Sequence, residues 1–76
     1  MTEFKVTYDR KVNSAYIYFI DAELRPTVAH MYACDPVEVG GMINLDFDEA
    51  GHLVGIEVLA ASSKLDPHVL DGAEQL

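Results

Sequence analysis

The sequence predicts a mostly β, α+β domain, in which one antiparallel sheet of four to six strands built from hairpins is followed by a short C-terminal helix. Three observations support this prediction. Short runs of aromatic and β-branched residues alternate with polar clusters along most of the chain, as strands alternate with turns. The string from Ile43 to Leu59 holds two such runs around an Asp-Glu-Ala-Gly turn, which is typical of a hairpin. Near the end of the chain, a proline and a glycine bracket a short helical segment.

The first two strands are predicted at Phe4–Tyr8 and Ser14–Ile20, joined by a polar turn over residues 9–13. Apolar side chains alternate with Lys5 and Thr7 in the first strand, which is the pattern of a strand with one buried face. The second strand is apolar on both faces, so we expect it to be central or covered on both sides.

A weaker third strand is predicted at Thr27–Cys34, after a polar break at Asp21–Arg25. The last two strands, Met42–Phe47 and Leu53–Leu59, form the hairpin, and Gly51 supplies the positive φ angle that suits its turn.

One face of this hairpin is expected to be buried. The residues predicted to pack across it are Val54, Ile56 and Val58 from the second strand and Ile43, Leu45 and Phe47 from the first. We expect Asn44 and Asp46, on the opposite face, to be exposed to water.

The C-terminal helix begins at Asp66, which is a good N-cap residue, with Pro67 at the first helical position and Gly72 as the stop. Residues 1–76 form one domain. A chain of this length buries only about 60–65% of its unfolded surface, and Cys34, as the single cysteine, forms no disulfide within the chain. Association with a second copy is therefore an expected source of stability.

The second face of the strand Ser14–Ile20 is the candidate interface. It carries Tyr16, Tyr18 and Ile20, and an exposed patch of this kind promotes aggregation of a monomer. Pairing two such patches around a two-fold axis buries both, so we predict a homodimer. Ordinary packing of the tyrosines at the rim of the core is the alternative interpretation.

The net charge of -8 arises entirely after Cys34, where nine acidic residues accompany the one base Lys64. This distribution argues against nucleic acids and anionic membranes as partners, because both are bound through cationic side chains. It indicates either solubility or a basic protein partner. The lone cysteine, and the lack of a signal-like or membrane-spanning apolar run, predict a cytoplasmic location.

Two groups of residues are candidate metal sites. Asp46, Asp48, Gly51 and Glu57 occupy positions 1, 3, 6 and 12 of a calcium-loop pattern, but Ala50 provides no ligand at position 5, so the hairpin is the better interpretation. The histidines and the cysteine lack the spacing of a zinc site: His30, Cys34, His52 and His68. We therefore predict no catalytic residue, no metal ligand and no cofactor.

Two motifs resemble a known family. The first is Tyr8-Asp9 followed by Ala15-Tyr16-Ile17, and the second is I-N-L-D at residues 43–46 followed by G-H-L-V-G-I-E-V-L at residues 51–59. They resemble the small prokaryotic proteins catalogued as domain of unknown function 2283, over residues 4–65. The resemblance implies the fold and brings no activity with it.

The function that these observations favour is a non-enzymatic binding or assembly module. Its expected partners are a second copy of itself and a basic protein, which it would cap as an antitoxin caps a toxin. The alternative is an enzyme or small-ligand binder with its site at a subunit interface. A requirement for a metal or nucleotide would favour the alternative, whereas co-purification with a basic protein would favour the binding module.

Overall fold

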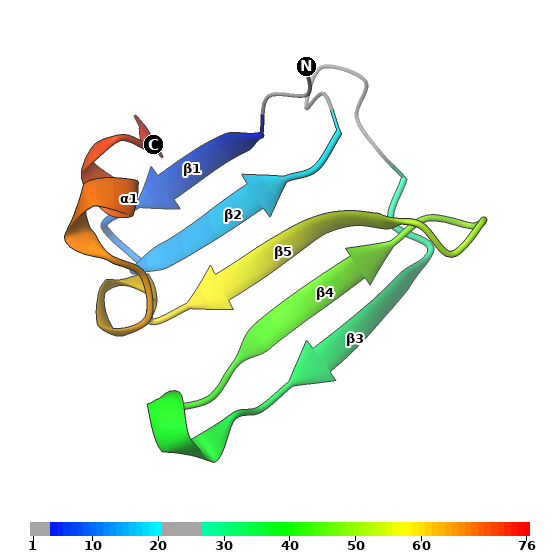
Figure 1. Ribbon diagram of the computed structural model, residues 1–76, viewed down its shortest axis with the longest axis horizontal. Helices are drawn as coiled ribbons and strands as arrows, with labels where there is room; N and C mark the ends of the chain where they lie inside the picture. The colour runs from blue at the N-terminus through cyan, green and yellow to red at the C-terminus, as the bar shows by residue number, and fades with distance from the viewer. Residues whose placement is uncertain (1–3, 21–26) are drawn as a thin grey trace.

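The computed structural model describes residues 4–20 and 27–76, and its strands form one sheet (Figure 1). The strands are β1 (Lys5–Asp9), β2 (Ser14–Tyr18), β3 (His30–Cys34), β4 (Ile43–Phe47), β5 (Leu53–Leu59) and β6 (Glu74–Gln75). The helical elements are the 3₁₀ turns η2 (Val37–Val39) and η3 (Ala61–Ser63) and the helix α1 (Pro67–Asp71). The predicted fold class, a mostly β sheet with a short C-terminal helix, is confirmed.

The strand order is β3-β4-β5-β2-β1-β6. All neighbours are antiparallel except β6, which runs parallel to β1. The prediction that consecutive strands pair as hairpins holds for three pairs and is wrong for β2 and β3, because β5 returns to pair with β2. The central position of β2 agrees with its apolar sequence. Strand β6 was not predicted, since two polar residues carry no strand pattern.

The pairing register arranges most of the apolar side chains of β1 to β5 in two neighbouring rows on one face of the sheet, here called the apolar face. Val54, which is 1% exposed, continues this face beyond Ile56 of the first row. The first row is Val6, Ile17, Ile56, Leu45 and Tyr32, one from each strand. The second row is Tyr8, Ala15, Val58, Ile43 and Cys34. The predicted packing of Ile43 on Val58 and of Leu45 on Ile56 is confirmed, whereas a bulge pairs Phe47 with Leu53.

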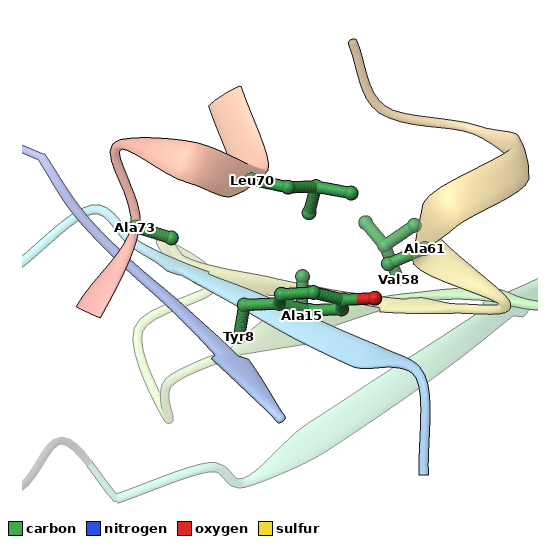
Figure 2. Close-up of a cluster of buried hydrophobic side chains, with 6 residues drawn as sticks. All are labelled: Tyr8, Ala15, Val58, Ala61, Leu70 and Ala73. Atoms are coloured by element: carbon green, nitrogen blue, oxygen red, sulfur yellow. The ribbon is translucent and has the colours of Figure 1, made fainter. Parts of the chain in front are cut away.

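The segment after β5 covers part of the second row (Figure 2). Leu70 of α1, Ala61 of η3 and Ala73 lie over Tyr8, Ala15 and Val58, and all six side chains are buried. This cover lies over the end of the sheet where β1 ends, β2 begins and β5 ends, and α1 and η3 lie well away from β3 (Figure 1).

Asn13 fixes the start of this covering segment. Its backbone carbonyl accepts a hydrogen bond from the N–H of Ala61 at 2.9 Å, and its side-chain oxygen accepts one from the N–H of Ser62 at 3.0 Å. The same side-chain oxygen accepts the hydroxyl of Tyr8 at 2.9 Å. Asn13 has a φ angle of 55°, a left-handed conformation that asparagine adopts more readily than most residues. The β1–β2 turn therefore anchors the C-terminal cover.

Several local predictions are tested by the structure. Asp66 caps α1, because its side chain accepts the N–H of His68 at 2.8 Å, and Gly51 adopts a φ angle of 83° in the β4–β5 turn. The third strand is shorter than predicted and begins at His30. The polar break predicted at Asp21–Arg25 lies outside the described residues. None of the described helices is long and apolar enough to cross a membrane.

Leu70 provides a test of the cover. Leu70→Ala is expected to lower the free energy of unfolding by about 2–5 kcal/mol, because it removes the largest covering side chain above the second row. The control is Val69→Ala in the same helix, where the side chain is 40% exposed and a change within about 0.5 kcal/mol is expected. Chemical denaturation measures both. Equal losses in the two variants would contradict this packing.

Candidate functional site

Tyr16 connects two strands that are not neighbours in the sheet, on the face here called the polar face. It extends from β2 across β5 and donates its hydroxyl hydrogen to Oδ2 of Asp46 in β4 at 2.6 Å. The phenol ring passes directly over Gly55, where a Cβ atom would overlap the ring and its hydroxyl. Glycine at this strand position is therefore explained by the close approach of Tyr16.

A second hydrogen bond lies beside the first. The side-chain amide of Asn44 donates to Oε1 of Glu57 at 2.9 Å, which again joins β4 to β5. Asn44 and Asp46 are both buried, each with 8% exposure. The prediction that these two residues face water is wrong, because side chains of the neighbouring strands lie across them and satisfy their polar atoms. Tyr16, Asn44, Asp46, Gly55 and Glu57 are here called the polar cluster.

The electrostatics of the cluster keep Tyr16 protonated. Burial, together with the hydrogen bond to Asp46, raises the pKa of the Tyr16 hydroxyl well above its ordinary value of 10.0. The phenol therefore acts as a hydrogen-bond donor at neutral pH. Among the described residues, no buried side-chain nitrogen or oxygen is left without a partner. The chemistry of the polar cluster is thus a set of hydrogen bonds that braces three strands.

The predicted interface residues lie partly in this cluster. Tyr16 and Tyr18 are on the polar face with ring centroids 4.5 Å apart, and both are half-buried. Ile20 lies beyond the end of β2, is 37% exposed and lines a shallow depression next to Asp48 and Val54. Their role as an interface stays a prediction, since no partner chain is present.

The structure separates the residues of the calcium-like string. Asp46 and Glu57 lie on different strands and accept hydrogen bonds from Tyr16 and Asn44, while Asp48 accepts the N–H groups of Ala50 and His52 in the turn. The N–H of His52 is the main reason that the pKa of Asp48 lies below its usual range. Within residues 4–20 and 27–76, no group of three or more potential metal ligands converges.

The apolar face presents a second candidate site, which is the first of its two rows. Tyr32 in this row is 65% exposed, and the other four side chains are partly buried. This row is here called the open row: Val6, Ile17, Ile56, Leu45 and Tyr32. Phe4 and Phe19 lie beyond it with an edge-to-face contact of 5.0 Å, and Phe4 is 57% exposed. Sequence alternation assigned these strands to a core, but the pattern does not tell how far one chain covers that core.

A comparison with protein families identifies the chain. Residues 5–62 match the model of the protein family of unknown function DUF2283. The chain belongs to this family. No curated protein and no solved structure matches it. The DUF2283 match spans β1 to β5 and ends within η3, so the polar cluster and the open row lie within the family's own region, whereas α1 and β6 lie outside it.

Gly55 tests the polar cluster. Gly55→Ala is expected to lower the free energy of unfolding by about 1–3 kcal/mol, because the added Cβ atom forces the Tyr16 ring to move. The same substitution in a Tyr16→Ala background is expected to have a much smaller effect, which a double-mutant cycle of denaturation curves measures. Additive effects of the two substitutions would refute the contact.

The raised pKa of Tyr16 predicts a loss of stability in alkali. Below pH 10.0 the tyrosine is neutral in both states, and above it the unfolded chain ionises first, so stability falls as the pH rises towards the folded-state pKa. Tyr16→Phe is expected to flatten this fall in melting temperature above pH 10, whereas Tyr32→Phe, at an exposed site on the other face, is the control. Identical pH profiles for the wild type and Tyr16→Phe would exclude this assignment.

Proposed function

We propose that this DUF2283 protein is a small non-enzymatic binding and assembly module, which acts in the cytoplasm as a homodimer and binds a basic protein. The observation that supports the basic partner is the hydrogen bond made by Lys64, which is the one lysine or arginine in the acidic half of the chain. Lys64 donates to the backbone carbonyl of Leu59 at 2.6 Å, so its ammonium is used to hold the chain after β5.

In the part of the chain that the structure describes, most acidic residues of the C-terminal half have no lysine or arginine partner. Among the described residues, Glu74 pairs with Lys5 at 3.0 Å, and no other carboxylate lies within ion-pair distance of a lysine or arginine. The remaining negative field attracts a positively charged surface and speeds its association. A basic protein is the partner that this field favours.

An assembly role is supported by the apolar content of the chain. Half of its residues are hydrophobic, yet the buried apolar side chains among the described residues number seven, and three of these are alanines. A chain with this balance gains stability by association, which supports the homodimer. In one specific form of the proposal, the dimer caps a basic toxin as an antitoxin does.

The proposal predicts that binding of the basic partner weakens as the salt concentration rises. Capture with the tagged full chain, followed by mass spectrometry, is expected to recover one protein with an isoelectric point above about 9 at low salt and to lose it at high salt, because screening weakens the attraction. Recovery of the partner that does not depend on salt, or of none from cells that contain the chain's own genomic neighbours, would contradict the proposed partner. A chain that needs a metal or nucleotide for partner binding would favour the alternative of a ligand-binding site.

A further inference from the structure

We infer that the open row on the apolar face is the surface on which a second copy of this chain docks, sheet against sheet. The inference rests on the proposed homodimer and names its interface. It assigns the contact to the face opposite the polar cluster, with Ile17, Ile56 and Leu45 at its centre and Tyr32 at its edge.

The accessible surface of the chain supports association of this size. A compact monomer of 8.4 kDa is expected to expose about 4,600 Å², whereas this chain exposes 5397 Å². The excess of about 800 Å² belongs to the whole surface and is comparable to the area that each partner buries in an interface of standard size. The radius of gyration, 12.4 Å, likewise exceeds the value of about 11.4 Å expected for 76 residues.

Among the described residues, the covering segment lies over the second row, and of the open row only Val6 and Ile56 pack against the core that it forms. Asn13 anchors the covering segment at η3, and the segment then places Leu70 and Ala73 over the second row, where the strands β1, β2 and β5 meet. It ends by pairing β6 alongside β1 at the edge of the sheet. This segment therefore covers one end of the apolar face.

The lack of charged residues on the apolar face of β1 to β5 favours a second copy of the chain as the occupant of this face. The strand residues of β1 to β5 that lie on the apolar face include no lysine, arginine, aspartate or glutamate, whereas Lys5, Asp9, Asp46 and Glu57 lie on the polar face. A basic partner docked on the apolar face would find no carboxylate there to pair with. Two copies of this face match each other, because a two-fold axis brings the same apolar patch against itself.

The dimer and the basic partner are expected to respond to salt in opposite directions. Each subunit carries a net charge of -8, so two subunits repel each other, and added salt screens this repulsion. Self-association on the apolar face therefore tightens as salt rises, while capture of a basic protein on the acidic surface weakens. The salt dependence of the two equilibria therefore distinguishes dimerisation from binding of the basic protein.

Adjacent residues of β3 provide a matched test. Tyr32 is 65% exposed and lies on the apolar face, whereas Met31 is 62% exposed and lies on the polar face. Tyr32→Glu and Met31→Glu add the same charge to the same strand at equal exposure. By sedimentation equilibrium of the full chain, Tyr32→Glu is expected to raise the dimer Kd at least about tenfold, and Met31→Glu is expected to change it less than about threefold. Leu45→Glu, checked for folding by circular dichroism, is a second variant of the open row.

The outcomes separate the inference from the proposed function. A folded wild-type monomer at tens of micromolar would overturn both the dimer and this interface. A dimer that survives Tyr32→Glu and a folded Leu45→Glu, but dissociates in Tyr18→Glu, would overturn the open row and place the interface on the polar face. Equal weakening by Met31→Glu and Tyr32→Glu would also overturn it, in favour of pairing between β3 edges. Dissociation confined to the open-row variants would support it.

Discussion

The anchor of the segment that follows β5 decides which part of the apolar face this segment covers. Five strands place two rows of apolar side chains on one face, and among the described residues the segment after Leu59 packs on the second of them. Its anchor at Asn13 directs it to the end of the sheet next to the β1–β2 turn. The position of the buried core follows from this anchor.

The side chains on the two faces of the sheet are stabilised by different interactions. On the polar face, cross-strand hydrogen bonds satisfy buried groups within one chain, so Tyr16 holds Asp46 and Asn44 holds Glu57 without help from a partner. On the apolar face hydrogen bonds cannot take this role, because only contact with further nonpolar surface removes these side chains from water. Bracing within a subunit is thus assigned to one face, and association between subunits is proposed for the other.

The family motif acquires a physical meaning from this division. The glycine of the L-V-G-I-E string is required where the Tyr16 ring crosses β5, and the aspartate of the I-N-L-D string accepts the hydroxyl of that ring. The glutamate of the first string accepts the amide of Asn44. These motif residues therefore explain how three strands are held in register, and the acidic surface and the open row remain the places where a partner would act.

The sequence by itself determined the strands, the β4–β5 hairpin and the cap of α1, because alternation, turn residues and capping residues act over a few neighbouring positions. It also determined the acidic character and the family. Only the tertiary structure decided that β5 returns to β2, that the tail forms β6, and that Asn44 and Asp46 are buried, since each depends on contacts between residues far apart in the chain. The same holds for the candidate sites. Alternation places Ile17, Leu45 and Ile56 on an apolar face, but the extent of their cover depends on where Asn13 anchors the C-terminal segment.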